Sequence, residues 1–137
     1  MRRAFHLIYT LLALNFLIPV VFYAVDPGGT LAQFTELNQL LGGTGYTFSE
    51  DSVLWRVLAI ANVSTLGFCC VLLQVDLQKY YPVLLPLVFL KSMAALGFLV
   101  AFIVEGYPAF LAASLFDSLT VGAMLFFATR AHAELAR

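Results

Sequence analysis

The chain has 137 residues, of which 62% are hydrophobic and 11% charged, and its formal net charge is −1. Charged residues make up roughly a quarter of a typical soluble protein, so a water-soluble fold of this length could not bury so much apolar surface. The length indicates a single domain over residues 1–137. No run of Lys and Arg that could face phosphates is present, so nothing indicates nucleic-acid binding.

Four apolar runs approach or exceed the roughly 18 to 20 residues that a helix needs to cross a bilayer. A helix satisfies its own backbone hydrogen bonds, which the hydrocarbon cannot do. The runs cover about residues 5–25, 53–75, 81–104 and 109–129. We therefore predict an all-α integral membrane protein, built as an antiparallel bundle of four transmembrane helices.

The first run follows Arg2 and Arg3, a pair that is also typical of a signal peptide. The apolar stretch is longer than the usual core of a signal peptide, and Phe22-Tyr23-Ala24 places a bulky residue where cleavage requires a small one. We interpret the run as a retained helix. Asn15 lies near its middle, and Pro19 one turn later should bend it.

The first outer loop contains a helix pattern of its own. Residues 26–29 read as a turn, and Thr30 and Gln33 have the spacing of a capping box. Apolar residues then recur every three or four positions until Gly42. This pattern predicts a short amphipathic helix over about 30–41, too short to span. We favour a lid over the outer end of the bundle and leave partner docking and ligand gating open.

The second run opens with Trp55 and Arg56, which we predict to be an outer-interface anchor, with phosphate or carboxylate binding by Arg56 left open. Asn62 lies close to the middle of the run. The adjacent Cys69 and Cys70 point in different directions from one helix, and no second pair accompanies them. We interpret them as small packing residues.

The third and fourth runs contain the two charges that lie deep inside apolar sequence, Lys91 and Asp117. Short turns follow residues 75 and 104, so consecutive spans should be antiparallel neighbours. At about 1.5 Å per residue the two charges differ in depth by roughly one helical turn. We expect them to form an ion pair.

Each predicted span thus supplies one strongly polar group at a similar depth: Asn15, Asn62, Lys91 and Asp117. An unpaired charge at the centre of a bilayer costs at least about 2.5–3.5 kcal/mol, so mutual neutralisation is favoured, with the two asparagines completing the hydrogen bonds. The cluster is either a register-fixing pair, a site that contacts a ligand or a proton, or a docking point for a larger partner.

Orientation follows from the basic residues. With the N-terminus inside, the inner face receives Arg2, Arg3, Lys79, Arg130 and Arg137, whereas the outer face receives Arg56 alone. This bias predicts that both termini are cytoplasmic, in a multi-pass protein of the cytoplasmic membrane. Aromatic residues should anchor both boundaries, with Tyr23, Trp55 and Tyr107 outside and Tyr9, Tyr80 and Tyr81 inside.

No metal or cofactor motif is present. His6 and His132 both fall at the inner face, but no further ligand joins them, so we interpret them as interfacial rather than metal-binding or haem-binding. No cofactor is predicted, and a quinone or a lipid is left open. No catalytic residue is identified, and the sequence favours a protein that is not an enzyme.

Scattered positions resemble the DoxX-like family of small four-helix bacterial membrane proteins. They are Trp55-Arg56, the inner turn with Asp76, Lys79 and Tyr80-Tyr81-Pro82, Lys91, and Phe116-Asp117-Ser118-Leu119. The resemblance implies an accessory or quinone-adjacent subunit in the cytoplasmic membrane. It supplies no catalytic residue.

Three functions follow. The leading one is a non-catalytic accessory or structural subunit of a larger membrane complex, with a redox complex left open as what the resemblance implies. The alternative is a small transmembrane binding or transport bundle for a quinone, a lipid-like molecule or an ion, which would use the polar cluster. The third is a membrane enzyme with Lys91 and Asp117 as acid and base. A homo-oligomer is also compatible with the sequence.

Overall fold

The computed structural model describes residues 2–44 and 53–136, and the side chains of all of these except 53–55. Most of the described residues are helical, and no strand occurs among them. The helices are α1 (Arg2–Val25), α2 (Pro27–Leu40), α3 (Val53–Val75), α4 (Leu77–Tyr80), a short 3₁₀ helix (Tyr81–Val83), α5 (Leu84–Glu105) and α6 (Pro108–Leu135). Four of the segments are long and apolar enough to cross a membrane: Arg2–Val25, Arg56–Val75, Leu77–Glu105 and Pro108–Leu135.

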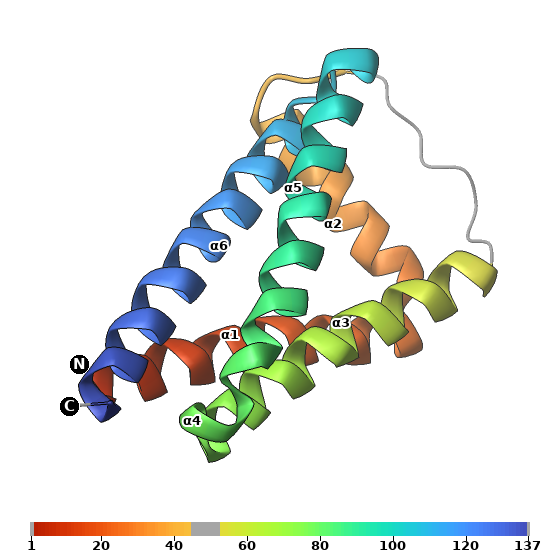
Figure 1. Cartoon of the computed structure of the whole chain (residues 1–137). Helices are drawn as coiled ribbons and strands as arrows, with labels where there is room; N and C mark the ends of the chain where they lie inside the picture. Colours follow the sequence, from red (N-terminus) through yellow and green to blue (C-terminus); the bar gives the residue numbers. More distant parts are fainter. Residues whose placement is uncertain (1, 45–52, 137) are drawn as a thin grey trace.

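The long helices pack as two pairs, α1 with α3 and α5 with α6. Both chain ends and α4 lie at one end of the molecule, which we call the terminal end (Figure 1). From α4 the two pairs diverge, so α3 and α5 separate soon after their connection (Figure 1). We expected α3 and α5 to be packed neighbours because their connection is short, but α3 packs chiefly against α1.

Helix α2 crosses the open side of this wedge. It starts directly after α1 and runs towards the turn between α5 and α6 (Figure 1). The hydroxyl of Tyr107, at the start of α6, lies 3.5 Å from the carbonyl oxygen of Phe34 in α2. Rings of α2, α5 and α6 gather at this contact, with ring centroids 6.4 Å apart for Phe34–Phe98 and 6.3 Å apart for Phe34–Phe110.

The start of α2 differs from the predicted capping box at Thr30 and Gln33. Asp26 caps the helix instead, and its Oδ1 accepts from the amide of Gly29 at 2.9 Å. Pro27 takes the first helical position, where no intrahelical donor is needed and the fixed φ favours the helix. The predicted turn at 26–29 is therefore the first turn of the helix. At the other end Gly42 adopts φ +80°, a conformation that glycine adopts readily.

Helices α1 and α3 approach each other closely because Gly67, at their contact, has no side chain. A Cβ at this position would lie 2.6 Å from Cδ2 of Leu17. The core at the terminal end combines residues spaced three or four apart on α1, which places them on one face of the helix. These residues are Phe5, Tyr9, Ala13 and Phe16, and they pack with Leu66, Cys70 and Leu73 of α3.

Tyr9 joins the two helix pairs. Its side chain is fully buried, and its hydroxyl donates to the carbonyl oxygen of Met124 in α6 at 2.9 Å. The prediction that Tyr9 is an interfacial anchor was therefore wrong, because a buried acceptor satisfies its hydroxyl. Met124, Ala128 and Ala131 are buried on the same face of α6. The two alanines allow the pairs to approach closely here.

Replacing Ala128 with Leu should separate the two helix pairs. Ala128 is fully buried, and extra methyl groups in a packed core cost about 1–3 kcal/mol. We expect Ala128→Leu to lower the unfolding temperature of the purified protein, measured by reaction of the buried Cys70 thiol with a fluorogenic dye. Ala133→Leu, at an exposed position of the same helix, should leave it unchanged. Equal effects of both variants would contradict the close packing at Ala128.

Candidate functional site

The two charges in the third and fourth apolar segments meet. The ammonium of Lys91, on α5, donates to Oδ1 of Asp117, on α6. The Lys91 side chain is 12% exposed and that of Asp117 is 6% exposed, so little solvent screens the contact. The ammonium also lies 5.2 Å from the ring centroid of Phe16 on α1, a favourable cation–π distance.

Small residues bring α5 and α6 close enough for this contact. The hydroxyl of Ser114 donates to the carbonyl oxygen of Ala95 at 2.8 Å, across the two helices. Ala95, Ser114 and Asp117 are all buried. A serine facing an alanine permits the short backbone separation that larger side chains would prevent.

The ion pair borders a cavity of about 490 Å³ where the two helix pairs diverge. This volume lies within the range of roughly 300–1,000 Å³ typical of small-molecule sites. Helices α1, α2, α3, α5 and α6 all contribute residues to its wall. The lining consists of Asn15, Phe16, Pro19, Tyr23, Phe34, Leu37, Val63, Leu66, Lys91, Phe98, Ala112, Ala113, Phe116 and Asp117.

Polar groups from α1 and α5–α6 converge on this cavity, whereas the rest of its wall is apolar. Asn15 brings an amide, Tyr23 a hydroxyl, and Lys91 with Asp117 the ion pair. Pro19 has no N–H, so the backbone carbonyl of Asn15, four residues earlier, lacks its usual helical partner. The stretch of α1 that lines the cavity therefore contains a backbone carbonyl without its usual helical partner.

Asn62 does not join this group. Its side chain is exposed and does not line the cavity. On α3 the positions that face the rest of the molecule are Val63, Leu66, Cys70 and Leu73. One residue of an α-helix turns the side-chain direction by about 100°, so Asn62 lies beside the packed face despite its suitable depth. The predicted four-residue cluster is thus reduced to Asn15, Lys91 and Asp117 around the cavity.

The predicted outer anchor lies at the start of α3. Arg56 is half-buried, and the side chain of Trp55 lies outside the described residues. Arg56 does not line the cavity.

The histidines and cysteines have packing contacts. The His132 ring stacks on Tyr81 with centroids 3.9 Å apart, and the His6 ring meets the edge of Phe5 at 5.3 Å. Both cysteines are free thiols; Cys70 is buried in the core, and Cys69 packs against it. Within residues 2–44 and 53–136, no three His, Cys, Asp or Glu side chains group to hold a metal ion.

The sequence did not predict that Phe34, Phe98 and Phe116 line a cavity; Phe116 was noted only as part of the DoxX-like resemblance. In an apolar sequence, a ring that faces a cavity has the same pattern as a ring that faces lipid. Pro19 and Asn15, one turn apart, were the available signal, because a missing amide beside a polar side chain marks a polar break in an apolar helix.

Comparisons of the chain with models of known protein families, with curated proteins and with solved structures gave no match.

Removing one partner of the ion pair should be more harmful than removing both. Asp117→Ala leaves the Lys91 ammonium uncompensated, which costs about 3–5 kcal/mol at a buried site. We expect a large loss of folded protein in membrane fractions, measured by fluorescence-detected size-exclusion chromatography, and recovery in the double variant Lys91→Met/Asp117→Leu. Glu105→Ala, at the exposed end of α5, serves as the control. Equal losses in the single and double variants would show that the charges do not depend on each other.

Proposed function

We propose that the protein spans the cytoplasmic membrane four times, as a bundle with both termini in the cytoplasm. Four segments of sufficient length and apolarity support this placement. The start of α1, helix α4 and the last turns of α6 all lie at the terminal end (Figure 1). These segments carry Arg2, Arg3, Lys79 and Arg130, and basic residues favour the cytoplasmic side. Arg137 lies outside the described residues.

Within this placement, the function that the geometry supports best is binding of a small amphiphilic molecule between the helices. The observation that carries the proposal is the cavity of about 490 Å³ with Lys91 and Asp117 in its wall. A pair that served only to fix the helix register would be surrounded by packed side chains. Here it borders open space, together with Asn15 and Tyr23.

The charge balance of the cavity indicates the chemistry of the ligand. Lys91 and Asp117 neutralise each other, so an anionic group would meet the carboxylate and a cationic group would meet the ammonium. Carbonyl and hydroxyl oxygens of an uncharged group can both accept from the ammonium, and a hydroxyl can also donate to the carboxylate. The surrounding rings of Phe34, Phe98 and Phe116 would contact the rest of the ligand, which is therefore apolar or planar. A quinone or a neutral lipid-like molecule has this combination.

Filling the cavity should release the ligand without unfolding the protein. Ala113 lines the cavity, and Ala113→Phe would place a ring in the open space. We expect the amount of co-purifying amphiphile, measured by mass spectrometry of organic extracts, to fall by roughly tenfold, equivalent to about 1.4 kcal/mol. Ala61→Phe makes the same change at an exposed position of α3 and should retain the ligand. Wild-type protein that carries no small molecule, or equal amounts in both variants, would contradict the binding function.

A second proposal is the accessory subunit that the sequence and the DoxX-like resemblance suggested. The observation in its favour is the row of exposed apolar side chains along the outward face of α5, which includes Leu85, Phe89, Leu96 and Ile103. A helix of a partner could cover this row in place of lipid.

Extraction in mild detergent separates the two proposals. A subunit should migrate within a larger assembly on native gels, and Phe89→Ser should release it, whereas Phe126→Ser, on an exposed position of α6, should not. Migration of the native protein at the size of a monomer or dimer would exclude the subunit function.

A further inference from the structure

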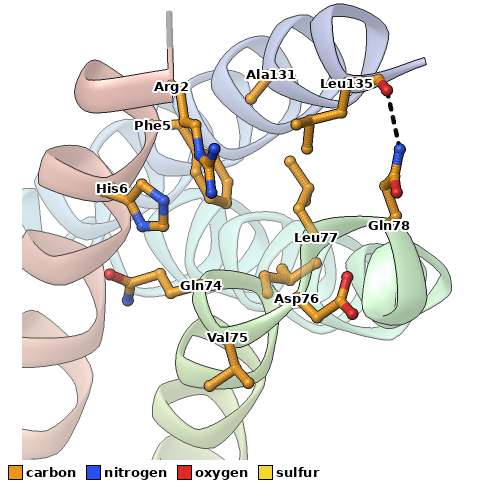
Figure 2. Close-up of a pocket in the computed structure, with 11 residues that line it drawn as sticks. Arg2, Phe5, His6, Gln74, Val75, Asp76, Leu77, Gln78, Ala131 and Leu135 are labelled. Carbon is orange, nitrogen blue, oxygen red and sulfur yellow. Dashed lines mark hydrogen bonds between the residues drawn. The ribbon is translucent and has the colours of Figure 1, made fainter.

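A second pocket, of about 230 Å³, lies at the terminal end, far along the helices from the ion pair. It is formed by the start of α1, the corner between α3 and α4, and the last turns of α6 (Figure 2). We call it the terminal pocket. Nε2 of Gln78 donates to the carbonyl oxygen of Leu135 at 3.0 Å and connects α4 to α6 across its rim.

Two basic side chains of α1 face this pocket. Arg2 and His6 are four residues apart, so they lie on the same side of the helix. Figure 2 shows the Arg2 guanidinium directed into the space between α1 and α6, with the His6 ring beside it. Among the described residues, neither has a salt bridge to a carboxylate.

The other polar groups of the pocket already have partners. Oε1 of Gln74 accepts from the Thr10 hydroxyl at 2.8 Å, and its Nε2 donates to the carbonyl of Cys70 at 3.2 Å. Gln78 is used at the rim. The amides therefore hold the walls in place, and the donors that remain for a ligand belong to Arg2 and His6.

The pocket also contains one carboxylate, that of Asp76. Its Oδ1 accepts from the backbone N–H of Lys79 at 3.0 Å and caps α4. Figure 2 shows Asp76 on the α3–α4 side of the pocket, away from the Arg2 guanidinium. Its charge is thus engaged in a local structural contact, and the half of the pocket next to α1 keeps a positive character.

Apolar residues form the floor of the pocket. Phe5, Leu73, Leu77 and Ala131 are all buried. Water is partly excluded on this side, so a charge placed against Arg2 is screened less than on an open surface.

We propose that the terminal pocket binds an anionic phosphate group through Arg2 and His6. A guanidinium presents paired N–H donors whose geometry matches two oxygens of a phosphate, and an imidazole adds a further donor. The group comes either from the head of an anionic phospholipid, in which no ammonium of the same head neutralises the phosphate, or from a soluble phosphate compound. This site is independent of the amphiphile proposed for the central cavity.

The test uses the full chain in two settings, with the unfolding temperature as the readout. In detergent, inorganic phosphate is compared with chloride at equal ionic strength. In nanodiscs, phosphatidylcholine with phosphatidylglycerol is compared with phosphatidylcholine alone. A ligand that binds the folded state raises the unfolding temperature, and we expect a rise of roughly 3 °C or more in at least one setting.

Three variants assign the effect to the pocket. Arg2→Gln should abolish the rise while leaving the unfolding temperature in chloride unchanged, because Arg2 is exposed and without a salt bridge among the described residues. Arg3→Gln, the neighbouring arginine that does not line the pocket, should keep the rise. Asp76→Asn should increase it, since asparagine still caps α4 while the repelling charge is removed.

Each outcome decides the proposal. If the unfolding temperature rises only in the nanodiscs that contain phosphatidylglycerol, the pocket binds lipid heads. If it rises with inorganic phosphate in detergent, with or without a rise in nanodiscs, the pocket binds phosphate groups in general. No rise in either setting, or a rise that persists in Arg2→Gln, overturns the proposal. A loss of the rise in Asp76→Asn also overturns it, because Arg2 would then act through Asp76.

Discussion

The contact between Lys91 and Asp117 is the constraint around which the rest of the structure is arranged. Two opposite charges inside apolar helices are tolerable only when each compensates the other, and this requires α5 and α6 to lie against each other in one register. Ala95, Ser114 and the close helix approach provide that register. In the membrane placement that we propose, the requirement is stricter, because the hydrocarbon offers neither charge a substitute partner.

The cavity beside the pair results from how the second helix pair is attached. The α1–α3 pair contacts α6 at the terminal end, where Tyr9 bonds to Met124 and the small Ala128 and Ala131 permit close packing. Beyond this contact the pairs diverge, and α2 bridges them through Phe34. Close packing at one end and α2 across the other leave a partly open space between the two helix pairs, and the ion pair borders this space.

The two pockets differ in charge, and this difference separates their chemistry. In the central cavity the opposite charges cancel, so uncharged polar groups are favoured. In the terminal pocket the carboxylate of Asp76 caps α4 and lies away from the Arg2 guanidinium, so the side of the pocket next to α1 favours an anion. A ligand with an apolar body and a ligand with a phosphate group could therefore be held at once without competing, because the sites lie at different distances along α1.

The sequence by itself determined where the long helices lie and predicted that Lys91 and Asp117 come within reach of each other, because hydropathy and the helical rise per residue are local properties. It also indicated a short helix between the first two spans, although Asp26 and Pro27, not Thr30, start it. Only the tertiary structure decided which way each side chain faces. A helix that is apolar on all sides has no contrast between a packed face and a lipid face, so nothing in the pattern distinguished Asn15, at the cavity, from Asn62, beside the packed face. For the same reason the burial of Tyr9 and the cavity itself followed only from how the two helix pairs meet.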